Sequence, residues 1–316
     1  MSQDSIPVAV VGVGHLGRHH ARLYASMPGV TLVGIVDQDA ERAAAMASEY
    51  GCEVIPQVED LPGRVRAVSV AVPTAYHRAV AEPLLRAGCD VLVEKPIATT
   101  LDEADAMVQA AADNDRILMV GHTERFNPAV LAMARAVERP RFFEVHRLAA
   151  FTARSTDIDV VLDLMIHDLD LMLALDGTDP VEVDAVGVAA LTDKVDIANA
   201  RIRFASGCVA NLTSSRISAD PIRRVRVFQA RTYMSCDTVQ RTVERFQLLP
   251  REGAAPEIRH DQLPVDEGEP LGNELSAFID AVRSREMPRI DGRQGRKVLD
   301  LAFRVNAAIE AHPARQ

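Results

Sequence analysis

The sequence lacks the features that mark membrane, secreted and nucleic-acid-binding proteins. Four cysteines occur among 316 residues, and none lies in a CxxC pair or near a histidine at zinc-ligand spacing. They therefore predict reduced thiols in a cytoplasmic protein and no metal site. No apolar run reaches the roughly 20 residues that a membrane span needs. Residues Met1–Pro7 contain no basic segment and no apolar leader, so we expect no signal peptide.

Positive charge is also scarce. The 35 basic residues are outnumbered by 45 acidic ones, which gives a net charge of -10 and disfavours nucleic acid and anionic membranes as partners. From Ser155 to Asp193 there are ten Asp or Glu and no Lys or Arg. The hydrophobic fraction of 48% is that of an ordinary globular protein. At about 150 residues per domain, the length predicts two domains.

The first 121 residues alternate between two hydrophobic periods. Short β-branched runs alternate with alanine-rich helical stretches, which predicts a parallel sheet with right-handed crossovers. We therefore expect a doubly wound α/β Rossmann domain over residues 1–121. The expected strands are Val8–Val13, Val30–Asp37, Ala67–Pro73, Asp90–Glu94 and Ile117–Gly121, with a weaker one at Cys52–Ile55, and the helices are His15–Met27, Asp39–Tyr50, Ala75–Ala87 and Leu101–Asn114.

Beyond Gly121 the pattern changes to consecutive strands, which implies an antiparallel sheet. Residues 122–316 are therefore predicted to form an α+β domain with a large open, mostly antiparallel sheet. The expected strands are Arg141–Phe151, Val181–Leu191, Ile197–Ala205, Cys208–Ile217, Arg223–Ala230 and Arg241–Leu249, and the helices are Asn127–Glu138, Asp159–Leu175, Leu271–Ser284 and Gly292–Ala311.

A glycine-rich turn follows the first expected strand and matches G-x-G-x-x-G. In such a turn Gly12 permits the tight bend, Gly14 lets the backbone approach a pyrophosphate, and Gly17 lets helix and strand pack closely. Asp37 ends the next strand, where a carboxylate accepts hydrogen bonds from a ribose diol but repels a 2′-phosphate. The pattern predicts NAD in preference to NADP, bound by Gly12, Gly14, His15, Leu16, Gly17 and Asp37.

Lys95 follows a buried strand at the sheet edge where ligands of open α/β sheets bind. Pro96 restricts the backbone of Lys95 to an extended or turn conformation. In a partly dry crevice the pKa of a lysine falls, and the amine can then exchange protons with an alcohol. A surface lysine in a turn fits the residues equally well.

These motifs together resemble the Gfo/Idh/MocA oxidoreductases, the family of glucose–fructose oxidoreductase and inositol dehydrogenase. The glycine turn, Asp37, the segment Pro73-Thr74-Ala75-Tyr76-His77 and the turn Glu94-Lys95-Pro96 match the family in order and spacing. The resemblance implies that Lys95 is a catalytic lysine beside the nicotinamide. It also implies a cofactor-binding role for Pro73, Thr74, His77, Glu94 and Lys95.

The expected helix Asp159–Leu175 carries a polar stripe that contains no Lys, Arg or Glu. At 100° per residue four side chains fall within an arc of about 80°: Asp159, Asp163, His167 and Asp170. Asp168 falls on the opposite side. Both a solvent-facing and a pocket-facing stripe fit this pattern. Inositol dehydrogenase-like members carry Asp-x-x-x-His at the substrate, which Asp163 and His167 match, so the resemblance favours the pocket.

The resemblance implies NAD-dependent oxidation of a secondary hydroxyl of a sugar or nucleotide sugar, with Lys95, Asp163 and His167 as catalytic residues. The sequence leaves open whether Lys95 or His167 accepts the hydroxyl proton. Arg125, Asn127 and Arg154 are candidate substrate-binding residues, since arginine forks suit phosphate or carboxylate; surface ion pairing is the alternative for the two arginines. The segments that carry them are most similar to a subgroup that oxidises the 3-hydroxyl of UDP-N-acetylglucosamine.

Three other functions stay open: a free-sugar or inositol-type polyol dehydrogenase, an NAD-dependent glycosidase, and a non-catalytic NAD-binding regulator. The intact set of Lys95, Asp163 and His167 disfavours the regulator. One face of the expected antiparallel sheet should be exposed, and in the family this face forms dimers or tetramers. We therefore expect a homo-oligomer whose other partner is a small sugar or UDP-sugar.

Overall fold

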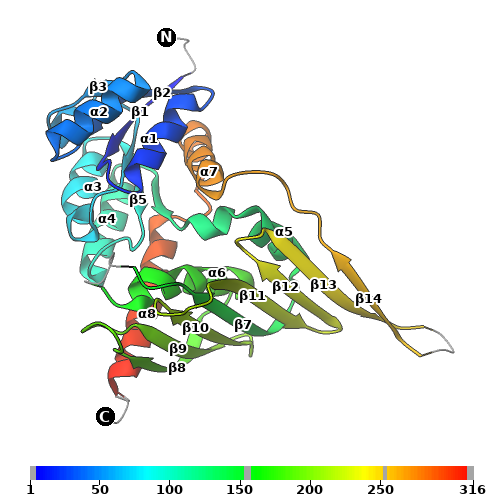
Figure 1. Ribbon diagram of the computed structural model, residues 1–316. Helices are drawn as coiled ribbons and strands as arrows, with labels where there is room; N and C mark the ends of the chain where they lie inside the picture. The colour runs from blue at the N-terminus through cyan, green and yellow to red at the C-terminus, as the bar shows by residue number, and fades with distance from the viewer. Residues whose placement is uncertain (1–4, 153–157, 252–254, 312–316) are drawn as a thin grey trace. The chain divides into compact units, whose positions relative to one another are not determined.

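The computed structural model describes residues 5–152, 158–251 and 255–311. The chain folds into two compact units: Met1–Thr123 with Leu271–Leu299, and Glu124–Pro270 with Asp300–Gln316. Each unit is built on one sheet (Figure 1). A predicted boundary after Gly121 does not anticipate the return of Leu271–Leu299 to the first unit. Within the described ranges, no helix is long and apolar enough to cross a bilayer.

The first unit contains a parallel sheet with the strand order β3-β2-β1-β4-β5-β6. Chain order reverses between β1 and β4, which creates the switch point where open α/β sheets bind ligands. The prediction of a doubly wound Rossmann fold is confirmed. The strands are β1 (Ile6–Val11), β2 (Val30–Val36), β3 (Glu53–Val54), β4 (Ala67–Val70), β5 (Asp90–Glu94) and β6 (Leu118–Gly121), and the helices between them are α1 (Gly17–Ser26), α2 (Ala40–Tyr50), α3 (His77–Arg86) and α4 (Leu101–Asp113).

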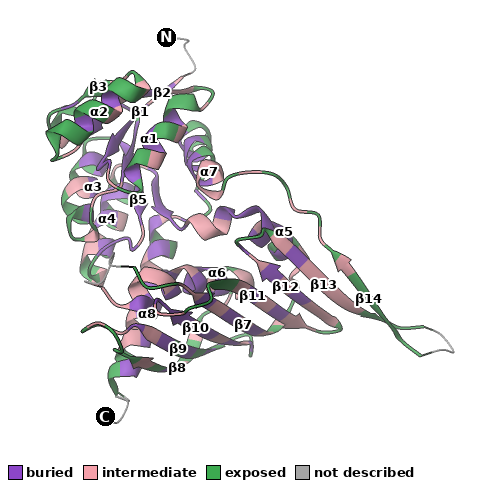
Figure 2. Cartoon of the chain, viewed as in Figure 1, coloured by how far each residue is buried: buried purple, intermediate pink, exposed green. Residues whose placement is uncertain are grey.

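The central strands of this sheet form the core of the first unit. Every residue of β4, β5 and β6 is buried, as expected for strands covered on both faces. Figure 2 shows this burial along β1 and β5, whereas the outer turns of α2 are exposed. Apolar strands covered by helices thus hold the loops at their carboxyl ends in place.

The returning segment closes this core through contacts that span much of the chain. It consists of α7 (Pro270–Ser284) and the start of α8 (Gly292–Ala311). The N–H of Val120 on β6 donates to the carbonyl of Ile290 at 3.0 Å. Arg285 donates to both carboxylate oxygens of the fully buried Asp90 at 2.8 Å. A buried carboxylate needs such a partner, so the segment completes the first unit.

The second unit contains a mixed sheet with the order β14-β13-β12-β11-β7-β10-β9-β8. The pair β7–β10 is parallel and the other neighbours are antiparallel, so the prediction of a mostly antiparallel sheet is confirmed. The strands are β7 (Pro140–Leu148), β8 (Pro180–Val188), β9 (Ile197–Phe204), β10 (Val209–Ser215), β11 (Ile222–Gln229), β12 (Thr232–Asp237), β13 (Thr242–Leu249) and β14 (Glu257–Gln262).

Helices cover one face of this sheet. α5 (Pro128–Ala136) packs on β12 and β13, and α6 (Ile166–Asp176) packs on β7. Arg147 on β7 donates to both carboxylate oxygens of Asp168 on α6, at 2.9 and 2.7 Å. Buried and half-buried residues alternate along much of β10, β11 and β12 (Figure 2), which is the period of a strand with one covered face.

Two local features differ from the prediction. The strand β12 was not expected. The hairpin before it turns at Arg231, which adopts a φ of 60° without the glycine or asparagine that marks such turns. The helix expected to run unbroken from Asp159 instead opens with a π-helical turn, Val161–Met165, before α6 begins.

Candidate active site

A pocket of about 360 Å³ lies at the carboxyl ends of β1, β2 and β4 in the first unit. Its walls include four of the predicted cofactor-binding residues: Gly12, Gly14, Asp37 and Pro73. Two more, His15 and Leu16, are exposed on the turn that leads into α1, and Thr74 begins a short 3₁₀ turn next to Pro73. The predicted residues on the glycine turn, on the loop after β4 and at the end of β2 thus gather around the switch point of the sheet.

Steric contacts fix two glycines of the turn. A Cβ on Gly17 would lie 1.8 Å from the carbonyl oxygen of Gly12, which no side chain can accommodate. Gly12 has a φ of 84°, and a Cβ there would lie 2.9 Å from the backbone of Ala71, so its conformation needs glycine. A Cβ on Gly14 would meet no heavy atom within 4 Å. The backbone of Gly14 therefore borders open space.

Asp37 directly follows β2 and is held by several donors. Its Oδ2 accepts from the N–H of Val13 at 2.7 Å, and its Oδ1 accepts from the N–H of Asp39 at 2.8 Å. Arg42 donates to the same two oxygens at 3.3 and 2.6 Å. Burial alone would raise the pKa of Asp37, but the hydrogen bonds from Arg42 and the two N–H groups hold that pKa below its usual value. The pocket therefore contains an ionised carboxylate joined to the glycine turn.

The Glu94-Lys95-Pro96 turn leaves β5 at the carboxyl edge of the sheet. Lys95 is half-buried, and its peptide bond to Pro96 is cis. Glu94 is 6% exposed and points into the unit, where its Oε1 lies 3.0 Å from Nε2 of His20 on α1. A Cβ on Gly121 of β6 would lie 3.1 Å from the Glu94 carboxyl group. Glu94 therefore supports the turn from the interior.

His77 joins this turn to the loop after β4. Its Nε2 lies 3.0 Å from the carbonyl oxygen of Val72, and its Nδ1 lies 3.0 Å from that of Pro96. The side chain is 1% exposed. Burial lowers the pKa of His77, although the nearby carbonyl groups raise it in part. Like Glu94, His77 has a supporting position beneath the site and not a place on the pocket surface.

In the second unit, Asp163 and His167 lie on the π-helical turn and the first turn of α6. Both are half-buried. The arc calculated for a regular α-helix does not apply from Asp159 to Asp163, because the π turn is wider. The other members of the stripe are used by the fold. Asp159 Oδ1 accepts two backbone N–H groups of the turn at 2.8 and 2.9 Å, and Asp170 is 1% exposed. Asp163 and His167 are each partly accessible.

The three candidate substrate-binding residues differ in their positions. Arg125 Nη1 lies 3.4 Å from the Asp170 carboxylate. Burial raises the pKa of Asp170 to about 7, although Arg125 acts to lower it. Asn127 is 3% exposed and caps α5, because its Oδ1 accepts from the N–H of Ala129 at 3.1 Å. Its Nδ2 donates to the carbonyl of Thr238 at 2.9 Å, so Asn127 has a structural position. Arg154 lies outside the described residues.

Comparison with known proteins gives the family. Residues 6–122 match the family described as "Oxidoreductase family, NAD-binding Rossmann fold", and residues 131–232 match the GFO/IDH/MocA C-terminal domain. The chain belongs to the Gfo/Idh/MocA oxidoreductases. The predicted family and the predicted enzyme class are thus confirmed.

Relatives within the Gfo/Idh/MocA family match over nearly the whole chain. The UDP-N-acetylglucosamine 3-dehydrogenase of Acidithiobacillus ferrooxidans is 42% identical over 308 residues, which cover 96% of each chain. Its crystal structure superposes with a TM-score of 0.91 and covers 97% of this chain and 98% of that one. An inositol 2-dehydrogenase of Rhizobium meliloti is 28% identical and covers 94% of this chain and 95% of its own.

The structure adds residues to the NAD-binding half that the motifs do not identify. Arg42 and Tyr76 line the pocket beside Asp37 and Pro73. Arg42 lies five residues after Asp37 on the first turn of α2, and Tyr76 lies within the Pro73–His77 segment, so helix position and proximity to a motif could have indicated them. Among the described residues, no group of three or more His, Cys, Asp or Glu is arranged to hold a metal ion.

Proposed function

We propose that this oxidoreductase uses NAD to oxidise a secondary hydroxyl of a nucleotide sugar to a ketone, and that the 3-hydroxyl of UDP-N-acetylglucosamine is the group oxidised. The observation that carries this proposal is the 42% identity to a UDP-N-acetylglucosamine 3-dehydrogenase over 96% of both chains. The similarity extends through both units, so it includes the unit that carries Asp163 and His167. Those residues match the acid–histidine pair expected at the substrate.

The first unit fits a bound dinucleotide. An added Cβ would collide with neighbouring atoms at Gly12 and Gly17 but would meet open space at Gly14. This arrangement is expected where a backbone turn receives a pyrophosphate. The ionised Asp37 supports NAD in preference to NADP, because its charge would repel a 2′-phosphate. Arg42 would attract such a phosphate, but it is already paired with Asp37 at 2.6 Å.

The proposed chemistry assigns the proton and the charge to residues of the chain, while bound NAD supplies the hydride acceptor. Either Lys95 or His167 accepts the substrate's hydroxyl proton. The cationic Lys95 stabilises the developing alkoxide. Asp163 orients the imidazole of His167 for this proton transfer. Glu94 and His77 hold the Lys95 turn from inside the first unit. Replacing Lys95 or His167 by Ala should therefore abolish turnover.

The test combines purified protein, NAD and a panel of UDP-sugars, free sugars and inositols, with a ketone-trapping reagent because oxidation by NAD is often uphill. We expect nicotinamide absorbance to rise with UDP-N-acetylglucosamine and the product to be lighter by two hydrogens. Turnover of a free sugar or polyol alone would overturn the substrate and retain the reaction. Failure of the whole panel, with NADH still bound, would overturn the proposed activity.

We also propose that the second unit forms a homo-oligomer through the face of its sheet opposite α5 and α6. Five rings lie across that face with successive centroids 5.6, 4.9, 5.5 and 4.2 Å apart. This aromatic row consists of Phe142, Phe228, Tyr233, Phe246 and His260. Aromatic side chains are enriched at protein interfaces. The proposed compartment is the cytoplasm, because all four cysteines are free thiols.

A further inference from the structure

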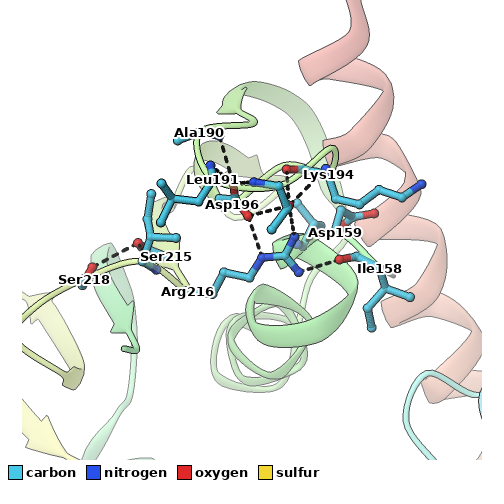
Figure 3. Close-up of polar contacts among 12 residues, drawn as sticks. Ile158, Asp159, Ala190, Leu191, Lys194, Asp196, Ser215, Arg216 and Ser218 are labelled. Carbon is cyan, nitrogen blue, oxygen red and sulfur yellow. Dashed lines mark hydrogen bonds and ion pairs between the residues drawn. The ribbon is translucent and has the colours of Figure 1, made fainter. Parts of the chain in front are cut away.

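A buried ion pair lies beside the turn that carries Asp163. Asp196 directly precedes β9 and Arg216 directly follows β10, and they are 0% and 5% exposed. Arg216 Nε donates to Asp196 Oδ1 at 2.8 Å, and the Arg216 N–H donates to the Asp196 carbonyl at 3.0 Å. Figure 3 shows the guanidinium of Arg216 between Asp196 and Ile158. The pair belongs to none of the motifs that indicate the cofactor or the substrate.

The loop after β8 surrounds the Asp196 carboxylate with donors. Its Oδ2 accepts three backbone N–H groups, those of Ala190, Leu191 and Thr192, at 2.9, 2.6 and 2.9 Å. The Thr192 hydroxyl donates to Oδ1 at 2.8 Å. Burial opposes ionisation, but the donors outweigh it and hold the pKa of Asp196 far below its usual value. The carboxylate is therefore a permanent anchor for Arg216.

Arg216 extends this anchor to the start of the helical segment. Its Nη1 donates to the carbonyl of Ile158 at 2.6 Å, and its Nη2 donates to Thr192 Oγ1 at 2.9 Å. Ile158 precedes Asp159, whose carboxylate caps the π-helical turn. A planar guanidinium that donates in several directions fixes both position and orientation, which a lysine cannot do.

Two further bonds hold the same turn. The N–H of Val160 donates to the carbonyl of Val195, next to Asp196, at 2.9 Å. Asn306 on α8 donates to Asp159 Oδ2 at 3.1 Å. The turn is thus held by the β8–β9 loop, by the end of β10 and by α8. Asp163 lies four residues after Asp159 in this held segment, and α6 with His167 follows it directly.

We propose that Arg216 and Asp196 are positioning residues for the substrate site: they fix the π-helical turn so that Asp163 and His167 meet the substrate in the productive orientation. The inference rests on the proposed catalytic role of Asp163 and His167. A π turn departs from the bonding of a regular α-helix, and here the residues that lead into it are held by contacts from other elements. A displacement of about 1 Å at such a site can lower the rate about 100-fold.

The first test compares Arg216→Met with Arg216→Lys. Loss of the guanidinium should lower kcat about tenfold or more, whereas the NADH dissociation constant should stay unchanged because the glycine turn and Asp37 belong to the first unit. Arg216→Lys keeps the charge and should recover part of kcat. If Arg216→Met folds and retains wild-type kcat, the proposal is wrong.

Two variants separate positioning from general destabilisation. Asn306→Ala removes one outer anchor from a half-exposed residue, so it should fold and lower kcat by a smaller factor. Arg245→Met is the matched control, because Arg245 forms an ion pair with Asp261 through side-chain hydrogen bonds of 2.9 and 2.7 Å, on β13 and β14 at the far end of the sheet. It should leave kcat unchanged. An equal fall in kcat in Arg245→Met would contradict a positioning role.

A spectroscopic readout keeps this inference separate from the proposed substrate. The ring resonances of His167, assigned by their absence in His167→Gln, should shift in Arg216→Met and Asn306→Ala but not in Arg245→Met. This holds even if the wild-type protein oxidises none of the sugars, an outcome that would overturn the proposed function alone. Unchanged His167 resonances in a folded Arg216→Met protein would overturn the positioning proposal.

Discussion

Single residues were predictable where their chemistry allows few alternatives. Gly12 and Gly17 occupy positions where a side chain would collide with backbone, and their spacing directly after an expected strand indicated the turn. Asp37 was recognisable from its position, because it ends the next strand at a fixed distance from the glycines. Arg42 was not singled out, because an exposed arginine on a first helical turn is common and its position five residues after Asp37 only hints at a contact. The contact of Arg42 with Asp37 is visible only in three dimensions.

Gly17→Ala and Gly14→Ala form a matched pair at the glycine turn. The methyl group of Gly17→Ala would lie 1.8 Å from the Gly12 carbonyl oxygen, so we expect a loss of about 1–3 kcal/mol of stability, and of NADH binding with it. Gly14→Ala meets no neighbour within 4 Å. The Gly14→Ala protein should therefore unfold at the wild-type temperature. It should bind NADH more weakly, because its methyl group would occupy the space where the pyrophosphate approaches the backbone. Thermal unfolding measures the stability of each variant, and fluorescence titration measures its affinity for NADH. Equal unfolding temperatures for the two variants would contradict the steric argument.

Asp37→Ser should change the cofactor preference. It removes the charge that would repel a 2′-phosphate and releases Arg42, which then has no carboxylate at 2.6 Å. We expect the ratio of kcat/KM for NAD to that for NADP to fall about tenfold or more, since one charge contact is worth about 1.4 kcal/mol or more. The double variant Asp37→Ser/Arg42→Ala should not gain NADP activity. An unchanged ratio in Asp37→Ser would show that Asp37 does not select the cofactor.

At the scale of elements, the sequence predicts the strands and helices that carry a clear period and misses those defined by backbone conformation. The central strands of the first sheet are mostly apolar, and all six strands of that sheet were predicted. β12 was missed because its hairpin turns at Arg231, an arginine with positive φ. The π-helical turn was missed because its side-chain pattern fits an α-helix, whereas its bonds depend on Asp159 and on contacts with other elements.

His77 connects two elements of the first unit and should make its stability depend on pH. Burial lowers the pKa of His77 in the folded state below the value of about 6.5 in the unfolded chain. As the pH falls through that value, the unfolded chain takes up a proton that the folded state refuses, so this contribution to stability decreases. The difference in unfolding free energy between wild type and His77→Gln should narrow from pH 8 to pH 5.5. A constant difference in urea unfolding would contradict a neutral buried His77.

At the scale of the whole molecule, the change from alternating helices and strands to consecutive strands predicts two domains. The return of α7 to the first unit could not be predicted, because it depends on pairs such as Arg285 and Asp90, which lie 195 residues apart. Neither the hydrophobic pattern nor the charge pattern of α7 distinguishes one sheet from the other as its partner. Contacts between residues far apart in the sequence therefore determine where the chain divides.

The aromatic row makes the assembly of the whole molecule testable. Rings that stay half-buried or exposed on a sheet face gain further burial only against another surface. The aromatic row is flanked by the ion pair of Arg226 with Glu144 at 2.7 Å. A second copy presents the same two features, so a twofold arrangement can match rings with rings and opposite charges with each other. Wild-type protein should sediment as a dimer or larger species at micromolar concentration. Phe228→Glu, which places a charge in the row, should shift it toward the monomer.

Met287→Glu is the control for that shift, because it adds the same charge at a residue of the first unit that is 73% exposed. It should sediment like the wild type. A monomeric wild-type protein would overturn the proposed oligomer, and an oligomer that survives Phe228→Glu would place the interface elsewhere.

The aromatic row shares its sheet with the buried Arg216–Asp196 pair, since Phe142 lies on β7, Arg216 follows β10, and these two strands are neighbours. If association through the aromatic row also stabilises the sheet that positions Asp163 and His167, kcat in Phe228→Glu should fall together with the fraction of oligomer.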